Sequence, residues 1–458
     1  MIIIGGGLAG LASAVALAEE GFRVTLLEKR PHLGGRATSF TLPTGEEIDN
    51  CQHVTMGCCT NLADFYRRVG AAQQIGTYER LFFLDAQGRR GVIEPATFPP
   101  PLHLAPSFAL FPSLTAADKR AIGRAMFYIA WNGGRPPGVK GTSMADWLQR
   151  QRQTPEAIER FWRTVLVSAL NEELDRTDAF YGVDVFWKAF LANRRGFEVG
   201  IPTVPLAELY DGCREPILAR GGEVRTRASV NALRMVGEKV AGVTLDDGTE
   251  LRADYVVCAV PHAAFLTLMP ATHIDREPAF AGVRNLEASP ISGVHFWFDR
   301  PVMQEPFLTL LDRTTQWVFN KTRLSGLPTN GAQYLQLVIS ASYGMVEMSR
   351  QEIVALCLRE LHEALPAARE AKLEKATVIK EVAATFSPRP GCDRWRPTQG
   401  TALRNFFLAG DWTRTGWPAT MEGAVRSGYL AAEAILAVED RHRRLLVPDL
   451  PTEGLSRW

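Results

Sequence analysis

Residues 49–59, Asp-Asn-Cys-Gln-His-Val-Thr-Met-Gly-Cys-Cys, gather three of the chain's seven cysteines with a histidine and an aspartate. Such side chains serve as metal ligands, redox thiols or proton donors. Metal sites and redox disulfides favour paired CxxC or HxxxH units. Here Cys58 and Cys59 are adjacent, and Cys51 and His53 have no matching pair downstream. We therefore expect no metal site and no disulfide, and we interpret the cysteines as small packing residues. Asp49 and His53 remain as candidates for chemistry.

The first residues of the chain carry the glycine spacing of a dinucleotide-binding loop. Gly5, Gly7 and Gly10 form a GxGxxG pattern directly after an apolar run. These glycines permit a tight turn and the close approach of a pyrophosphate, which lies at the positive end of the following helix. Glu28 stands where an acidic residue accepts hydrogen bonds from a ribose hydroxyl.

A βαβ unit must position these residues, and the sequence pattern predicts one. The apolar run enters the glycines as a strand, residues 11–20 predict a helix, and residues 22–28 predict a second strand. Gly34, Gly35 and Arg36 follow, and a guanidinium at this point can reach the same pyrophosphate from its other side. That arrangement suits FAD better than NAD, although a solvated Gly-Gly turn explains the segment equally well in isolation.

The other end of the chain offers a second cofactor segment. Residues 406–409 predict a strand that ends in Gly410 and Asp411, and a helix with small residues on one face is predicted after Pro418. The start of this helix would direct free N–H groups and a positive dipole at an anionic group, such as the ring of a reduced flavin. The candidate cofactor residues here are Gly410, Asp411, Met421, Glu422 and Ala424.

These segments resemble a known superfamily. The glycine-rich opening, the Gly-Gly-Arg turn and residues 408–428, LAGDWTRTGWPATMEGAVRSG, are similar to the flavin amine oxidases and phytoene desaturases. The resemblance implies an α/β fold, in which discontinuous segments build a Rossmann-type FAD-binding domain beside an α+β substrate-binding domain. Together with residues 49–62, DNCQHVTMGCCTNL, the terminal motif is similar to the squalene-associated branch, the hydroxysqualene dehydroxylases.

The resemblance also implies an order of segments. Residues 1–70, 206–265 and 386–445 would form the FAD-binding domain, and residues 71–205 and 266–385 the substrate-binding domain. Residues 221–261 read as short strands that return to a buried strand, with Val230 matching a contact to the adenine end. The first substrate segment has a helical pattern, interrupted at residues 94–114, where prolines predict an apolar loop without regular structure. In the second, residues 289–301 and 332–344 predict apolar strands and residues 349–364 a helix.

The squalene-associated branch implies a specific reaction. Protonation of the allylic hydroxyl of hydroxysqualene releases water, and hydride from reduced FAD then gives squalene. Under this hypothesis His53 supplies the proton and Asp49 orients it. The substrate is an isoprenoid lipid, and because the chain has no second GxGxxG, the electron donor to the flavin is unidentified.

Three other functions remain open from the sequence. A carotenoid-type desaturase would use the same fold in the opposite direction, with oxidised FAD taking hydride. An amine oxidase would need an aromatic cage, for which Trp412 and Trp417 are the candidates. A lipid carrier would keep FAD without using it.

The composition of the chain argues against nucleic-acid partners and indicates a cellular compartment. The chain has 51 basic and 50 acidic residues, so no net charge directs it to nucleic acid. An odd number of cysteines, without a disulfide pattern, favours a reducing compartment. The sequence shows no signal peptide and no run of about 18 apolar residues. We therefore expect a cytoplasmic protein, and its insoluble substrate suggests peripheral contact with the inner face of the membrane.

Overall fold

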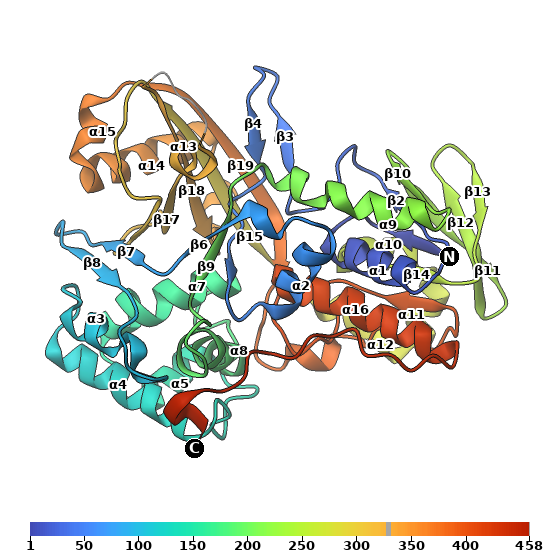
Figure 1. The fold of residues 1–458 in the computed structure, drawn as a ribbon, viewed down its shortest axis with the longest axis horizontal. Coiled ribbons are helices and arrows are strands. Elements are labelled where there is room, and N and C mark those ends of the chain that lie inside the picture. Colours follow the sequence, from blue (N-terminus) through green and yellow to red (C-terminus); the bar gives the residue numbers. More distant parts are fainter. Residues whose placement is uncertain (327–330, 458) are drawn as a thin grey trace.

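A five-stranded parallel sheet forms the half of the protein that contains the N-terminus (Figure 1). The computed structural model describes residues 1–326 and 331–457. The strand order is β10 (Glu223–Thr226), β2 (Thr25–Glu28), β1 (Ile2–Ile4), β14 (Val256–Cys258) and β20 (Phe406–Leu408). The middle strands are buried on both faces, as expected for a parallel sheet covered by helices. This architecture confirms the predicted Rossmann-type fold.

Two helices from opposite ends of the chain pack together beside this sheet. Helix α1 (Leu8–Glu19) is buried along almost its whole length, because α16 (Met421–Val438) covers it. A Cβ atom at Gly428 would lie 2.4 Å from the Ala9 carbonyl oxygen, so glycine permits this close approach. The short helices α2 (Thr60–Arg68) and α9 (Arg214–Ala219) pack against α16 and α1. Strand β2 is shorter than predicted because only Thr25–Glu28 pair with the neighbouring strands β1 and β10.

An antiparallel meander connects β10 to β14, as the sequence pattern predicts. It contains β11 (Val230–Val236), β12 (Lys239–Leu245) and β13 (Glu250–Arg252). After β14 the chain forms the short helices α10 (His262–Leu268), α11 (Ala271–Arg276) and α12 (Pro278–Gly282). The meander returns the chain to a strand whose residues are fully buried.

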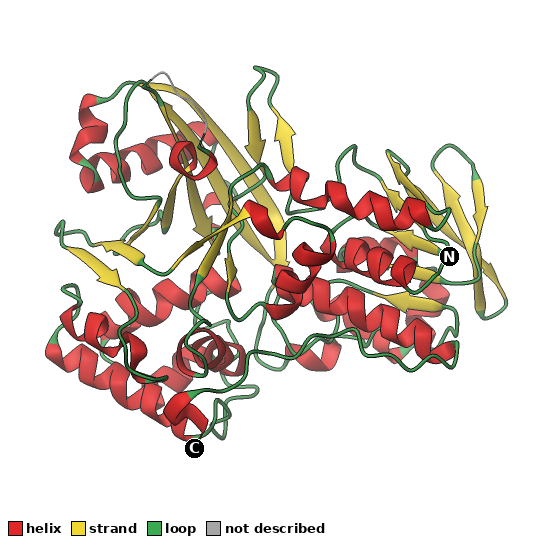
Figure 2. Cartoon of the chain, viewed as in Figure 1, coloured by secondary structure: helices red, strands yellow, loops and turns green. Residues whose placement is uncertain are grey.

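A mixed seven-stranded sheet forms the second half of the protein (Figure 2). Its order is β19 (Leu373–Phe386), β15 (Ala288–Phe298), β18 (Gln333–Ser340), β17 (Trp317–Asn320), β16 (Phe307–Leu310), β7 (Leu81–Leu84) and β8 (Arg90–Ile93). Helices α14 (Arg350–Ala364) and α15 (Pro366–Glu370) lie together against this sheet. Ser349 caps α14 in a capping box, which explains why the helix begins at the predicted position. The short helix α13 (Lys321–Ser325) follows β17.

Helices fill the space below the mixed sheet in the view of Figure 1. They are α3 (Ala105–Leu110), α4 (Ala116–Trp131), α5 (Met144–Arg150), α6 (Pro155–Ala157), α7 (Thr164–Leu170) and α8 (Ala179–Phe186). The prediction that residues 94–114 lack regular structure is wrong in part, because α3 and a 3₁₀ turn at Leu102–Leu104 lie within them. Pro106 is tolerated because it stands in the first helical turn, where its missing N–H has no helical partner. Within the described ranges, no helix has both the length and the apolar character needed to cross a bilayer.

Two small sheets connect the halves. The hairpin of β3 (Ser39–Thr41) and β4 (Glu47–Asp49) precedes residues 50–54. Strand β9 (Val199–Pro202) then lies between β5 (Thr55–Met56) and β6 (Ile75–Tyr78). All strands of the parallel sheet come from residues 1–70, 206–265 and 386–445. The domain boundaries themselves stay a prediction.

We predict that Gly428→Ala lowers the melting temperature, because its new methyl group would push α16 away from α1. Overpacking of this kind costs about 1–3 kcal/mol. Gly123→Ala is the matched control, since Gly123 is an exposed glycine within α4 and a Cβ there meets nothing within 4 Å. Replacing a helical glycine at such a site stabilises by about 0.5–1 kcal/mol. Thermal unfolding that shifts in the same direction for both variants would contradict this packing account.

Candidate functional site

Two glycine turns meet where the parallel sheet ends. Gly5 has a φ of +106°, and a Cβ at Gly10 would lie 1.9 Å from the Gly5 carbonyl oxygen. The second turn, at Gly34 and Gly35, also has positive φ angles. A Cβ at Gly35 would lie 2.9 Å from the Cα of Gly7. Side chains on either turn would therefore separate two backbones that a dinucleotide must approach closely.

Glu28 ends β2 directly beside these turns. Its carboxylate accepts hydrogen bonds from the Gly6 N–H (2.7 Å) and the Arg30 N–H (2.8 Å). These bonds fix the carboxylate at the cavity that the glycines border. Each carboxylate oxygen keeps a second lone pair, so both can still accept from a ribose hydroxyl.

The predicted cofactor residues from the two chain ends meet in an ion pair. Arg36 donates from Nη2 to Asp411 Oδ2 at 2.8 Å and also donates to the Ala384 carbonyl oxygen. Both residues border the same cavity as Val230 and Gly410. Gly410 has a φ of +142°, and a Cβ there would lie 2.5 Å from the Trp412 indole nitrogen. Gly10 does not line the cavity and instead packs against the first turn.

The N-terminus of α16 also faces the cavity, through Met421, Glu422 and Ala424. Thr420 caps the helix by accepting from the Gly423 N–H (3.0 Å), so the first-turn N–H groups of Met421 and Glu422 remain for an anionic group. The Glu422 side chain has a different role. Its buried carboxylate accepts from the Asn61 N–H (3.2 Å) and the Leu62 N–H (2.7 Å) and thereby caps α2, while burial raises its pKa. Glu422 would therefore contact a cofactor through its backbone.

One cavity of about 810 Å³ joins this cradle to the second half of the protein. At the cradle end the glycine turns, Glu28, Arg36 and the α16 N-terminus fit the ribose, pyrophosphate and flavin of FAD. Beyond the cradle the wall is mainly apolar, and Leu81, Phe83, Phe190, Ile291, Trp317 and Val338 are among its residues. One π-helical stretch, Trp187–Leu191, contributes Phe190 to this wall, and a second, Ile158–Arg163, precedes α7. Such stretches occur frequently at functional sites.

His53 lines the cavity between the cradle and the apolar wall. Its Nδ1 lies 3.0 Å from the Cys51 carbonyl oxygen. Because a carbonyl only accepts, Nδ1 carries a proton and Nε2 is the nitrogen that exchanges protons. Burial lowers the pKa of His53, so its neutral form, with a free Nε2 lone pair, dominates at neutral pH. Burial also raises the pKa of the neighbouring Cys51 to about 12, which keeps that thiol protonated.

The structure corrects the predicted role of Asp49. Its carboxylate accepts from Lys321 Nζ (2.7 Å), the Leu206 N–H (3.0 Å) and the Ser39 hydroxyl (2.7 Å), and His53 is not among these partners. Burial disfavours the charged carboxylate, but Lys321 and the Leu206 N–H outweigh burial, and the pKa of Asp49 is lowered. The Cys51 carbonyl, and not Asp49, orients the His53 ring.

Asp49 instead anchors the segment that carries His53. Lys321 Nζ also donates to Gln52 Oε1 (3.0 Å), and Gln52 Nε2 donates to the His53 carbonyl oxygen (3.1 Å). Sequence reasoning missed Lys321, because it lies 272 residues from Asp49 and no local pattern marks it. It also missed Glu381, a cavity carboxylate 3.5 Å from the Asn50 amide nitrogen.

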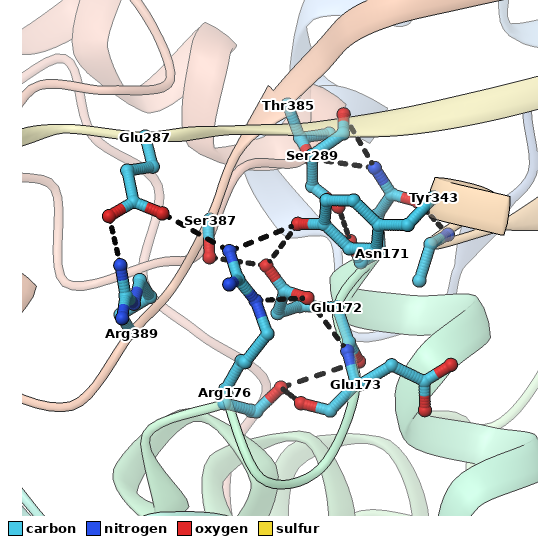
Figure 3. A network of polar contacts seen from close by, with 12 residues as sticks. Asn171, Glu172, Glu173, Arg176, Glu287, Ser289, Tyr343, Thr385, Ser387 and Arg389 are labelled. Carbon is cyan, nitrogen blue, oxygen red and sulfur yellow. Dashed lines mark hydrogen bonds and ion pairs between the residues drawn. The ribbon is translucent and has the colours of Figure 1, made fainter. Parts of the chain in front are cut away.

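Asn171 fixes the cavity wall at the end of α7 (Figure 3). Its amide donates to the Ser289 carbonyl oxygen (3.2 Å) and to the Thr385 hydroxyl (2.9 Å), and it accepts from the Ala341 N–H (2.7 Å). Asn171 and Thr385 both border the cavity. These bonds tie α7 to strands β15 and β19 and to the segment after β18. The φ of +53° at Asn171 is a conformation that asparagine tolerates better than most residues.

Glu172, the next residue, also connects the end of α7 to the segments that follow β18 and β19. Its carboxylate is fully buried and accepts hydrogen bonds from the Tyr343 hydroxyl (2.7 Å) and the Ser387 hydroxyl. Arg176 Nε lies 3.1 Å from Glu172 Oε1 and completes the charge pairing (Figure 3). Asn171 and Glu172 carried no motif in the sequence, and only the assembled sheets give them partners.

The described residues contain no group of three or more His, Cys, Asp or Glu side chains that could hold a metal ion. All seven cysteines are free. Cys51 and Cys58 are buried and pack within apolar clusters. The cluster at residues 49–59 therefore contributes a histidine at the cavity, the aspartate of an anchoring ion pair and apolar packing.

Comparisons with known proteins agree with this geometry. The profile of the family described as "Flavin containing amine oxidoreductase" matches residues 8–436. The chain is 26% identical over 458 residues to a 15-cis-phytoene desaturase of Solanum lycopersicum, covering 95% of this chain and 77% of the relative. It is 26% identical to a zeta-carotene desaturase of Synechocystis sp., covering 96% of this chain and 97% of the relative.

Solved structures share the fold. An oxidoreductase from Methanosarcina mazei superposes with a TM-score of 0.75 at 20% identity, covering 95% of this chain and 99% of that one. A putrescine oxidase bound to putrescine superposes with a TM-score of 0.70 at 17% identity, covering 95% and 98%. The similarity therefore extends over both halves of the protein.

We predict that Gly35→Ala releases the flavin, because its methyl group would force the two glycine turns apart. Gly45→Ala is the control, since Gly45 also has a positive φ (+99°) but a Cβ there meets nothing within 4 Å. The loss of about 1.4 kcal/mol of binding free energy would weaken FAD binding about tenfold. The ratio of flavin to protein absorbance after purification measures the effect. Equal flavin retention by the two variants would contradict the assigned cradle.

Proposed function

This chain belongs to the family of flavin-containing amine oxidoreductases, its cofactor is FAD, and we propose that it reduces hydroxysqualene to squalene. One observation carries the proposal: a single cavity joins the FAD cradle to an apolar wall. A long apolar substrate can lie along that wall while one of its carbon atoms reaches the flavin end. The wall also excludes water, which would otherwise capture an allylic cation.

His53 is the proton donor in this proposal. With Nδ1–H bound to the Cys51 carbonyl oxygen, the protonated ring presents Nε2–H to the cavity. Transfer of that proton to the allylic hydroxyl lets water leave. Reduced FAD, when bound, supplies the hydride that completes the reduction. The lowered pKa of His53 makes its cationic form a stronger acid than an exposed histidine.

A carotenoid-type desaturation is the second candidate, and His53 is also the observation that favours it. The neutral ring has a free Nε2 lone pair, which can accept a proton from the substrate while hydride leaves for oxidised FAD. The two relatives are described as phytoene and zeta-carotene desaturases. Desaturation and reductive dehydroxylation thus place opposite demands on the same ring nitrogen.

Amine oxidation has less support from the site. The Trp417 ring already has Lys188 Nζ 4.3 Å from its centroid and the Arg426 guanidinium at 5.4 Å. A further cation at this ring would be repelled. Trp412 borders the cavity, but it is 1% exposed and its indole N–H donates to the Val260 carbonyl oxygen (2.9 Å), so little of its ring is free to surround an amine.

The pH dependence of turnover distinguishes acid from base. Because burial lowers the pKa of His53, an acid role predicts that kcat/KM rises as pH falls, by about tenfold per unit above that pKa, and levels off below it. A base role predicts the opposite slope. His53→Gln should remove the pH-dependent limb and lower kcat by about 10²–10⁴. A flat profile in the wild-type protein would exclude His53 from proton transfer, and Glu381→Gln would then be the next variant.

Anaerobic mixing tests the proposed reaction itself. We expect that chemically reduced protein mixed with hydroxysqualene reoxidises its flavin stoichiometrically and yields squalene, as followed by flavin absorbance and by mass analysis of the extracted lipid. Reduction of the oxidised protein's flavin by phytoene would instead establish desaturation. If neither lipid changes the flavin absorbance, both proposals are contradicted, and the lipid-carrier function is the one that stands.

A further inference from the structure

Three large apolar side chains are strongly exposed on α3 and α4. Leu110 is 83% exposed, Phe127 66% and Trp131 76%. The Lys119 ammonium donates to the Ala109 carbonyl oxygen (2.7 Å), which holds the first turns of α4 against the last turn of α3. The rings of Phe127 and Trp131 stack with centroids 5.8 Å apart. We call the stacked pair Phe127 and Trp131 the apolar face.

Two arginines lie on the same side of α4. Positions 120, 124, 127 and 131 follow helical spacing, and all four side chains are exposed. Among the residues that the structure describes, neither Arg120 nor Arg124 has an ion-pair partner. The opposite side of α4 is buried, through Ile122, Ala125 and Ile129. The exposed side therefore combines aromatic rings with free positive charge, although the whole chain is close to neutral.

Helix α4, which carries the apolar face, packs against the Trp187–Leu191 stretch, and Phe190 of that stretch lines the cavity. Phe83 lines the cavity, and its ring packs edge-on against Phe111 with centroids 5.2 Å apart. Phe111 is the residue that follows Leu110. Phe108 of α3 also packs against Phe161, which lies just before α7 (5.5 Å). One pair of aromatic rings, Phe83 and Phe111, thus lies between the cavity wall and the end of α3.

We propose that this side of α3 and α4 docks onto a bilayer that contains anionic lipid. The apolar face would enter the interfacial layer, where tryptophan and other aromatic rings are favoured, and Arg120 and Arg124 would contact anionic headgroups. Docking in this orientation brings the apolar end of the cavity to the membrane in which an isoprenoid dissolves. The inference rests on the proposed isoprenoid substrate.

The positive charge of Arg120 and Arg124 favours an anionic bilayer over a second copy of the chain as the partner of this surface. An isologous dimer through the apolar face would bring Arg120 and Arg124 of both copies close together, and like charges repel. An anionic surface pairs them instead. Exposed apolar patches beside basic residues commonly mark such contacts.

Co-sedimentation with vesicles tests the docking surface. We expect the purified flavoprotein to bind vesicles of phosphatidylcholine with phosphatidylglycerol more tightly than vesicles of phosphatidylcholine alone, and added salt should reduce the difference. Arg120→Gln with Arg124→Gln should weaken binding to the anionic vesicles by about fivefold for each arginine. Phe127→Gln with Trp131→Gln should weaken binding to both kinds of vesicle.

Matched controls come from the opposite side of the protein. Leu218→Gln with Val236→Gln removes apolar side chains of similar exposure, 56% and 67%, and Arg252→Gln with Arg404→Gln removes two exposed arginines. Neither control pair should change vesicle binding. Equal weakening by a control pair and its test pair would overturn the assigned surface. So would a wild-type protein that binds no vesicles, or one that self-associates through Phe127 and Trp131 in light scattering.

Measurements of hydroxysqualene turnover in detergent and in vesicles test the docking surface and the proposed reaction independently. With hydroxysqualene in detergent, the Phe127 and Trp131 variants should keep wild-type rates, whereas with the substrate in vesicles their rates should fall. Vesicle binding without hydroxysqualene turnover would support the surface and contradict the function. Turnover that is equal for all variants in vesicles would support the function and contradict the surface.

Discussion

Contact between residues near the two ends of the chain is the constraint on which the cofactor site depends. Helix α16 reaches α1 only because Gly428 lacks a side chain at the Ala9 carbonyl oxygen. Arg36 and Asp411, 375 residues apart, then pair at 2.8 Å. Parallel strands cannot be joined by tight turns, so the chain must leave the sheet between them. The second half of the protein is built from such an excursion, and the cavity therefore begins at the cofactor and ends in the other half.

A buried ion pair anchors the segment that carries His53 to helix α13 of the second half. Asp49 and Lys321 are almost fully buried, and such pairs contribute little net stability because desolvation offsets their attraction. Their value here is positional, since Lys321 also holds Gln52, whose amide holds the backbone of His53. The Cys51 carbonyl then fixes which ring nitrogen exchanges protons. Asn171 also holds part of the cavity wall in place, because its side-chain amide bonds to three separate chain segments.

The sequence predicted the features that depend on neighbouring residues. The glycine turns, the strand before Gly410 and the capped helix after Ser349 follow from local spacing, and the structure contains all of them. Two predictions failed for lack of tertiary context. Asp49 was assigned to His53 because they are close in sequence, whereas its partner Lys321 comes from a distant helix. The proline-rich segment was predicted to be irregular, yet α3 forms within it, and its first turn tolerates Pro106. Neither Lys321 nor Glu172 could be found in advance, because only folding brings their partners together.

Isotope transfer tests the central claim, that one cavity brings an isoprenoid alcohol to reduced flavin, most directly. The protein would be reduced in D₂O, so that the transferable flavin hydrogen is deuterium, and mixed with hydroxysqualene for a single turnover. Our account predicts squalene that carries one deuterium at the carbon that lost the hydroxyl. Squalene without deuterium at that carbon, or an eliminated polyene in its place, would contradict direct hydride transfer in this cavity.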